Sequence, residues 1–401
     1  MDANVLERYA DLIVSVGANV QPDQVLAIEA LPEAQPLVAA LARAAYDRGA
    51  RYVDVLYVDP EVKRVRAERA PESSLEWVPP WLGQRLLGLG ELNAARVVLT
   101  PLVPPGLLDG VDPARAGRDQ LPTVQELFQV IDERSVAWTV SPYPTEAWAR
   151  VVFPDLPPAE ALQRLWDDVI HVTRLDDPDP AAAWNARIDQ LWQVASRLDA
   201  LHLDAIHFEG PGTDLTVGLL PSSRFAKEGG ASQTRTGVRH LPNLPTEEVF
   251  TTPDPERTEG FVSSTKPLDV AGSLVTGLRI RFEAGRAVEI DADTNADAIR
   301  ARCAVDPGAS RLGEVALVDR ESRIGKLGRI FFMTLLDENA ASHLALGDGY
   351  SAPVGDAADF PRINESSIHI DFMIGSDDVA ATGTTAGGER VPLLRGGAWQ
   401  I

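Results

Sequence analysis

The stretch Tyr52-Val53-Asp54-Val55-Leu56-Tyr57-Val58 decides the fold of the N-terminal part of this 401-residue chain. It is a run of strand length, rich in β-branched and aromatic residues, which predicts a strand. Similar runs lie at 25–28 and 96–99, and apolar residues recur at helical spacing over 6–16 and 36–46. Strands that alternate with helices are typical of a parallel sheet with both faces covered. The sequence therefore predicts an α/β N-terminal domain with a parallel sheet.

The second half of the chain has a different pattern. Helical patterns continue over 159–172 and 181–198, but strand patterns dominate after them. The apolar runs on either side of Glu283-Ala284-Gly285-Arg286 predict a hairpin whose glycine takes a positive φ. We therefore predict two domains. Residues 1–200 form the α/β domain with a helical extension, and residues 201–401 form a mostly β (α+β) domain.

The composition of the chain argues against nucleic acid and membrane partners. The chain carries 59 acidic against 37 basic residues and a formal net charge of −22, which would repel phosphate backbones and anionic lipid surfaces. No apolar run is long enough to span a membrane, and the N-terminus shows no basic start followed by an apolar stretch. The single cysteine, Cys303, excludes an internal disulfide and a thiolate metal cage. We expect a cytoplasmic protein without nucleic acid or membrane partners.

The most informative segment for chemistry is Ile368-His369-Ile370-Asp371-Phe372. Side chains alternate between the two faces of a strand, so His369 and Asp371 would project together, away from the apolar residues between and beside them. An imidazole and a carboxylate on one strand face are well placed to bind one metal ion. The alternative is an exposed polar face that carries a chance ion pair.

Two further segments offer possible ligands. Asp337 resembles the N-cap of a short helix that would carry His343, and Glu338 lies at the entrance of that helix. Glu247 and Glu248 are adjacent in a β-prone run, so their side chains would point to opposite faces. Structural roles remain the alternative for each: a helical histidine in the core and solvated carboxylates at a strand end.

Glu314 opens the apolar run 314–318. A carboxylate at the start of a buried strand needs a cation or a metal as partner, unless that end of the strand is solvated. None of these segments identifies a site by itself. Together they supply imidazole and carboxylate groups, without a thiol, from elements that could converge in one β-rich domain.

Four blocks of sequence carry a resemblance to a known family. They are NLPTEEVFT at 243–251, LGEVALV at 312–318, LDENAASHLALG at 336–347 and SIHIDFMIG at 367–375. With VQPDQ at 20–24, they extend over nearly the whole chain. The chain resembles the thermophilic aminopeptidase T family of leucyl-type metallo-aminopeptidases.

The resemblance implies a homodimer that acts on peptides with two divalent metal ions per subunit. The C-terminal domain would then be the metal-binding catalytic domain. Imidazole and carboxylate ligands suit zinc, cobalt or manganese. The implied ligands, with Glu338 as either a ligand or the general base, are Glu248, Glu314, Glu338, His343, His369 and Asp371.

The resemblance also suggests how peptide cleavage would proceed. Two metal ions activate a water molecule and polarise the scissile carbonyl. A carboxylate must carry the proton of that water to the leaving amine, and Glu247 is the alternative to Glu338 for this role. Tyr350 matches an active-site tyrosine of the family and could donate a hydrogen bond to the tetrahedral intermediate. Its alternative role is that of an aromatic side chain packed over the site.

Two other functions remain open at this point. The same scaffold could carry a metal-dependent oxygenase or a hydrolase of non-peptide substrates, and a single redox-active iron would favour that reading. It could also be a non-catalytic dimer that binds peptides. The presence of every candidate ligand argues against this function, because a protein without activity need not retain them all.

Overall fold

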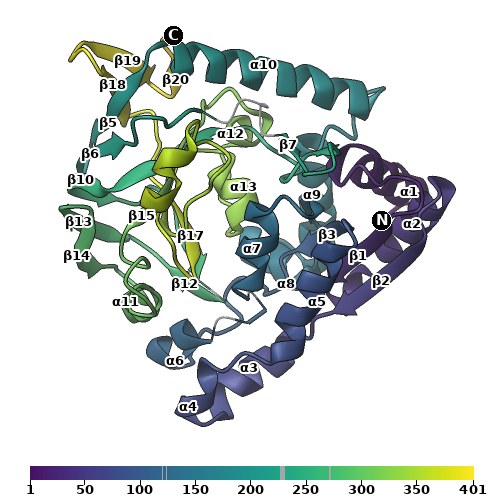
Figure 1. Ribbon diagram of the computed structural model, residues 1–401. Helices are drawn as coiled ribbons and strands as arrows, with labels where there is room; N and C mark the ends of the chain where they lie inside the picture. Colours follow the sequence, from purple (N-terminus) through teal and green to yellow (C-terminus); the bar gives the residue numbers. More distant parts are fainter. Residues whose placement is uncertain (120, 123, 226–230, 271) are drawn as a thin grey trace. The chain divides into compact units, whose positions relative to one another are not determined.

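The computed structural model describes residues 1–119, 121–122, 124–225, 231–270 and 272–401 (Figure 1). The chain forms two compact units, each assembled from separate segments. The first sheet is parallel and the others are antiparallel, which confirms the expected combination of an α/β region with a β-rich region. The domain boundary at residue 200 stays a prediction. The first unit comprises Met1–Leu108, Asp119–Ile188 and Gly230–Thr246, and the second Asp109–Arg118, Asp189–Gly229 and Glu247–Ile401.

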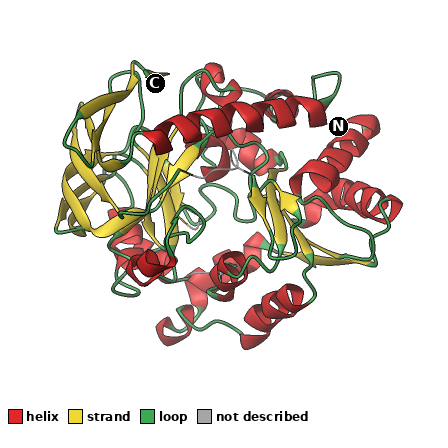
Figure 2. Cartoon of the chain, turned by 45° about the horizontal axis from the view of Figure 1, so that its top comes forward, coloured by secondary structure: helices red, strands yellow, loops and turns green. Residues whose placement is uncertain are grey.

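A four-stranded parallel sheet forms the centre of the first unit, in the order β2-β1-β3-β4. Three of its strands lie where the apolar runs predicted them. The fourth, β4, was not predicted. Figure 2 shows helices on both sides of this sheet. The strands are β1 (Val25–Ala30), β2 (Tyr52–Tyr57), β3 (Ala95–Thr100) and β4 (Ala137–Pro142).

The four helices predicted at 6–16, 36–46, 159–172 and 181–198 are present with similar bounds, as α1, α2, α9 and α10, whereas α3, α4, α5, α7 and α8 were not predicted. The first continues as a π-helical turn, and the second is followed by Gly49 with a φ of +84°. Because glycine adopts positive φ without steric cost, it suits the end of a helix. The helices are α1 (Ala3–Leu12), α2 (Gln35–Asp47), α3 (Pro60–Arg69), α4 (Glu72–Leu75), α5 (Pro80–Glu91), α7 (Glu126–Asp132), α8 (Glu146–Val152) and α9 (Pro158–Val172); α10 (Pro180–Ala200) leads into the second unit.

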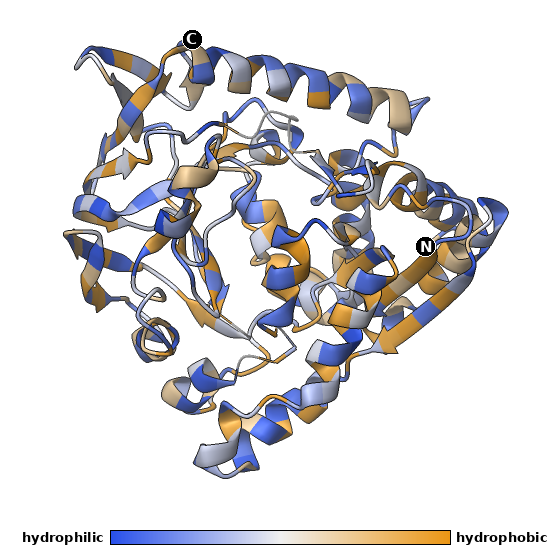
Figure 3. Cartoon of the chain, in the orientation of Figure 1, coloured by the Kyte–Doolittle hydropathy of each residue, from blue (hydrophilic) through white to orange (hydrophobic). Residues whose placement is uncertain are grey.

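Helices cover both faces of the parallel sheet, and burial is deepest on its two central strands, β1 and β3, whereas the edge strand β2 has exposed residues. Leu86 and Leu89 of α5 pack with Ala27 of β1 and Val130 of α7 on one face, and α2 covers the other. Figure 3 shows hydrophobic residues concentrated on the strands of this sheet. A strand that is buried on both sides has a continuous apolar sequence, which explains why β1 and β3 could be recognised from short apolar runs.

A buried ion network lies on the α5 face of this sheet. Arg96 of β3 donates to both carboxylate oxygens of Glu29, with a shortest distance of 2.7 Å, and Arg85 of α5 lies 2.9 Å from Glu29. Burial opposes ionisation of Glu29, but the two arginines outweigh it and lower the pKa of this carboxyl. Glu29 is therefore a structural residue of the first unit.

We expect Glu29→Gln to lower the free energy of unfolding by about 3–5 kcal/mol, because it leaves buried arginine charge without its partner. Since the pKa of Glu29 is lower in the folded state, its contribution is present above the ordinary value and is lost as pH falls. Urea unfolding at neutral and acid pH measures both effects. The control is Glu7→Gln, which removes an exposed pair with Arg43 and should cost less than about 1 kcal/mol. Equal costs for the two variants would contradict the assignment.

Two large antiparallel sheets dominate the second unit, and both contribute to its hydrophobic core. The eight-stranded sheet has the order β14-β13-β10-β6-β5-β18-β19-β20, and the four-stranded sheet has the order β17-β16-β15-β9. The predicted hairpin is present, with Ala284 and Gly285 both at positive φ. The strands of the larger sheet are β5 (Leu203–Gly210), β6 (Thr213–Leu219), β10 (Pro253–Ser263), β13 (Arg279–Glu283), β14 (Arg286–Asp291), β18 (Ala380–Thr385), β19 (Arg390–Arg395) and β20 (Ala398–Trp399).

The smaller sheet consists of short, almost completely buried strands. The two-stranded pair of β11 (Leu268–Val270) and β12 (Ser273–Val275) accompanies it, and in the first unit β7 (Ser232–Gln233) pairs with β8 (Arg239–His240). The strands of the smaller sheet are β9 (Val249–Thr251), β15 (Leu312–Leu317), β16 (His343–Gly347) and β17 (His369–Met373), and the helices of this unit are α6 (Pro113–Arg118), α11 (Ala296–Cys303), α12 (Arg323–Leu327) and α13 (Thr334–Glu338).

The predicted helix that would carry His343 is wrong. Helix α13 ends at Glu338, and His343 is the first residue of β16. Strand β16 pairs with β15 on one side and β17 on the other, so its backbone is hydrogen-bonded on both edges. This pairing outweighs the helical propensity of the Ala- and Leu-rich segment.

Among the described residues, no helix has the length and apolar character needed to cross a bilayer.

Candidate metal centre

Six imidazole and carboxylate side chains gather on the smaller sheet of the second unit. Their ligand atoms form three overlapping groups, within each of which all ligand atoms lie within 4.8 Å of one another. The structure thus brings together all six residues that the sequence proposed as ligands. The groups are Glu248, Glu314 and His343; Glu314, His369 and Asp371; and Glu338, His343 and Asp371.

Strand alternation explains why the side chains of Glu314, His343 and Asp371 share a face. Val315 of β15, Leu344 of β16 and Phe372 of β17 belong to the hydrophobic core. Their immediate neighbours in each strand therefore project to the opposite face. Those neighbours are Glu314 on β15, His343 and Ala345 on β16, and Asp371 on β17.

The register of the sheet leaves space between two of the carboxylates. Glu314 pairs with Ala345, and Ala345 pairs with Asp371, so the three residues form one row across three strands. Directly opposed side chains in an antiparallel sheet have Cβ atoms about 5 Å apart. Because the middle residue has only a methyl group, the carboxylates on either side face a common space.

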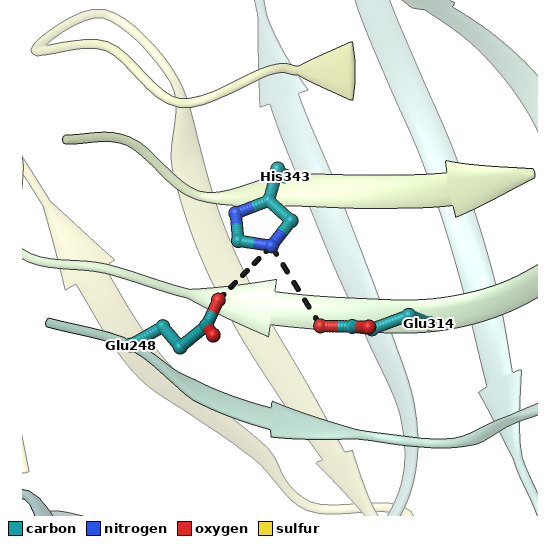
Figure 4. A group of neighbouring side chains, drawn as sticks. All are labelled: Glu248, Glu314 and His343. Atoms are coloured by element: carbon teal, nitrogen blue, oxygen red, sulfur yellow. Dashed lines mark ion pairs between the residues drawn. The ribbon is translucent and has the colours of Figure 1, made fainter. Parts of the chain in front are cut away.

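The carboxylate of Glu314 lies between two histidines. Its Oε1 is 3.7 Å from Nε2 of His343, and its Oε2 is 3.4 Å from Nε2 of His369. On the other side of His343, Oε2 of Glu248 lies 3.1 Å from the same Nε2 atom (Figure 4). The two oxygens of Glu314 are thus directed to two different groups of ligand atoms.

Backbone carbonyls determine which imidazole nitrogen faces the other ligands. Nδ1 of His369 lies 2.8 Å from the carbonyl oxygen of Asp348. Nδ1 of His343 lies 3.1 Å from the carbonyl of Glu338 and 3.2 Å from that of Ala341. Since a carbonyl can only accept, each Nδ1 is protonated and donates. Each Nε2 is then free to carry the lone pair that a metal requires.

The electrostatics of the cluster follow from burial and from crowding of like charge. Burial and the charges of Asp371 and Glu248 raise the pKa of Glu338 well above its ordinary value. Burial also raises the pKa of Glu248. Burial acts in the same direction on Glu314, but its interactions with the two histidines outweigh it and lower its pKa. A divalent cation would offset the cost of holding these carboxylates together.

Oε2 of Glu248 has the surroundings expected of a metal ligand. Oε2 of Glu248 is buried and accepts no hydrogen bond from the described residues, although Nε2 of His343 is only 3.1 Å away. The two atoms lie close together and, with Glu314, belong to one group of possible ligand atoms. Ligands of one cation have this arrangement. The donor set of imidazole and carboxylate, without sulfur, suits zinc, cobalt or manganese.

Tyr350 lies against one of the histidines. The centre of its ring is 5.0 Å from that of His369 and 5.8 Å from that of Phe250. Burial and the charges of Glu314 and Asp371 raise the pKa of its hydroxyl well above the ordinary value. The phenol is therefore protonated at neutral pH and retains a proton that it can donate.

Glu247 is buried but belongs to none of the three groups of ligand atoms. Its backbone N–H donates to the side chain of Asn339, at 2.6 Å. Sequence reasoning assigned no role to Asn339, nor to Asp348, whose carbonyl orients His369. Their positions next to proposed ligands were the available signal, but hydrogen bonds that a backbone group makes cannot be identified from residue types alone.

Comparison with known proteins gives the family. The family model described as thermophilic metalloprotease (M29) matches residues 2–399. Aminopeptidase T of Thermus thermophilus is 41% identical over 99% of this chain and 98% of its own length, and Aminopeptidase 2 of Geobacillus stearothermophilus is 37% identical over 98% and 97%. The solved structure of wild-type AmpT from Thermus thermophilus superposes with a TM-score of 0.87, at 40% identity, over 99% of both chains. The chain therefore belongs to the thermophilic metalloprotease family M29, as its sequence blocks predicted.

Proposed function

We propose that this metal-dependent aminopeptidase uses two divalent cations to hydrolyse the N-terminal residues of peptides. The observation that carries the two-metal proposal is the overlap of the ligand groups at Glu314, whose two oxygens face two different histidines. One cation would be held by Glu248, Glu314 and His343, and the other by Glu314, His369 and Asp371. The aminopeptidase names of the relatives support the type of substrate.

The residues of the chain prepare the site for this reaction. When bound, the metal ions would supply Lewis acidity that activates water and polarises the scissile carbonyl. Glu314 would fix the spacing of the two positions, because its carboxylate contacts both groups. Zinc, cobalt and manganese are the cations that match the donor set.

A carboxylate must take a proton from the attacking water and return it to the leaving amine. Glu338 is favoured over Glu247, because only Glu338 has a carboxylate oxygen within 4.8 Å of ligand atoms of both His343 and Asp371. Tyr350 would donate its phenolic proton to the oxyanion that develops on the substrate, since its ring lies against His369. Glu338 could instead complete the coordination of a metal ion.

The proposal extends to a cytoplasmic homodimer, which rests on the resemblance to the family and on the single cysteine of the chain. Two alternative functions are less well supported. A single redox-active iron would favour an oxygenase, whereas the ligand groups overlap as expected for two cations. A peptide-binding protein without activity would not need all six ligand side chains within one cluster.

Incubation with a chelator should abolish the release of N-terminal amino acids from a short peptide, and added zinc, cobalt or manganese should restore it. The reason is that the proposed reaction depends on water activated by metal, and the six grouped side chains offer only carboxylate and imidazole ligand atoms. The measurement is the release of free amino acids, with metal content determined in parallel on the same samples.

The same peptide with an acetylated N-terminus is the matched control and should resist cleavage, because exopeptidase action requires the free α-amino group. Full activity after complete removal of metal would contradict the proposal. Cleavage of the acetylated peptide at an equal rate would contradict the aminopeptidase assignment but not the metal site.

A further inference from the structure

Asn339 connects two parts of the site that are far apart in the sequence. Its side chain is fully buried, between Glu338 at the end of α13 and the segment that leads into β9. Oδ1 accepts from the backbone N–H of Glu247 at 2.6 Å. Nδ2 donates to the carbonyl of Leu335 at 2.9 Å and faces Oε1 of Glu338 at 3.3 Å. One amide thus contacts both carboxylate-bearing segments.

The orientation of this amide is determined by its partners. The N–H of Glu247 can only donate and therefore requires the amide oxygen, whereas the carbonyl of Leu335 can only accept and requires the amide nitrogen. Only this orientation satisfies both backbone groups. It also directs an N–H donor to the carboxylate of Glu338, which lies among other carboxylates in a buried site.

We infer that Asn339 is a positioning residue for the metal centre. It holds the carboxylate of Glu338 from one side and the backbone of Glu247, the residue before ligand Glu248, from the other. The distance between the carboxylates of Glu338 and Glu248 then depends on the side chain amide of Asn339. The inference rests on the proposed function, since it assigns Asn339 a role toward the ligands named there.

The test compares two substitutions that remove different parts of this connection. Asn339→Asp keeps an oxygen for the N–H of Glu247 but presents a second oxygen to the carbonyl of Leu335 and to Glu338. Asn339→Leu has a similar size and removes both interactions. Affinity for Zn²⁺ is measured by competition with a chromogenic chelator, and kcat and KM are measured with Zn²⁺ at saturation.

We expect both variants to bind Zn²⁺ about 10–100-fold more weakly, which is the usual effect of changing a residue that orients metal ligands. At saturating Zn²⁺, kcat should fall while KM changes by less than about twofold, because the displaced groups act on the reaction and not on the rest of the substrate.

The matched control is Asn295→Asp. Nδ2 of Asn295 donates to the carbonyl of Leu274 at 2.8 Å, so this variant also places an oxygen against a backbone carbonyl, but away from the six ligands. It should alter stability alone. Wild-type affinity for Zn²⁺ in folded Asn339→Asp and Asn339→Leu would overturn the inference.

The outcome also separates this inference from the proposed function. If the wild-type protein binds no Zn²⁺ and is insensitive to chelators, the proposed function fails. If the wild-type protein binds Zn²⁺ and both Asn339 variants bind it equally well, only the role of Asn339 fails. Circular dichroism and thermal unfolding of each variant show whether the protein compared is folded.

Discussion

Glu314→Gln should reduce kcat/KM by at least about 10³-fold, more than the roughly 10–100-fold loss typical of residues that only orient ligands. Glutamine has the shape of glutamate but presents an amide N–H₂ group in place of one carboxylate oxygen. Because the two oxygens of Glu314 face His343 and His369 separately, one substitution affects both positions. Metal analysis should show fewer than two ions per chain, with far-ultraviolet circular dichroism unchanged.

The comparison variant for this prediction is Glu248→Gln. Glu248 belongs to one ligand group only, so its loss should weaken one position and leave the other largely intact. A Glu314→Gln protein that retained two ions and wild-type turnover would exclude Glu314 as the shared ligand. Equal metal loss in both variants would show that the two positions do not depend separately on these carboxylates.

Ala345→Leu should weaken metal binding almost as strongly as Glu314→Gln, although residue 345 is not a ligand. The methyl group of Ala345 lies between Glu314 and Asp371 in one row of the sheet. A leucine there would put an apolar side chain among buried carboxylates, and close packing leaves it no alternative position. Zinc affinity and peptidase activity should both fall by about 10²-fold or more, on the scale of losses from disturbed ligands.

Two controls distinguish filling of this space from general destabilisation. Ala345→Ser adds one small polar atom and should retain metal. Leu346→Ala changes the next residue of β16, which belongs to the hydrophobic core; it should cost about 2–5 kcal/mol of stability without altering zinc affinity in the folded protein. Normal zinc affinity in Ala345→Leu would mean that the metal ions do not occupy the space beside this residue.

The sequence was informative about the fold wherever burial leaves a simple pattern. The strands at 25–30 and 95–100 are buried between helices, so they appear as short apolar runs, whereas the partly exposed edge strand at 52–57 was recognised from its β-branched and aromatic residues. The strand at 137–142 has a mixed pattern of burial and polar residues, and was not recognised. Segment 343–347 was expected to be helical, because its pairing with strands distant in the sequence has no local signal.

The candidate site shows the same limit. Alternation within one strand was enough to place His369 and Asp371 together, since both lie on β17. The grouping of Glu248, Glu314 and His343 depends on the register of three strands, and only the resemblance to a family suggested it. The role of Asn339 depends on contacts with a backbone N–H and a backbone carbonyl, which residue type does not predict.

The placement of the ligands on neighbouring strands has a consequence for the stability of the protein toward unfolding. The two proposed cations share Glu314, while His343 and His369 belong to different groups of ligand atoms, so together the cations would join three strands whose positions in the chain span more than fifty residues. Their binding free energy would then add to the free energy of unfolding, and the concentration of free metal would shift the melting temperature. Separation of β15, β16 and β17 would then require release of the ions. The metal ions proposed for catalysis would thus also stabilise the sheet that binds them.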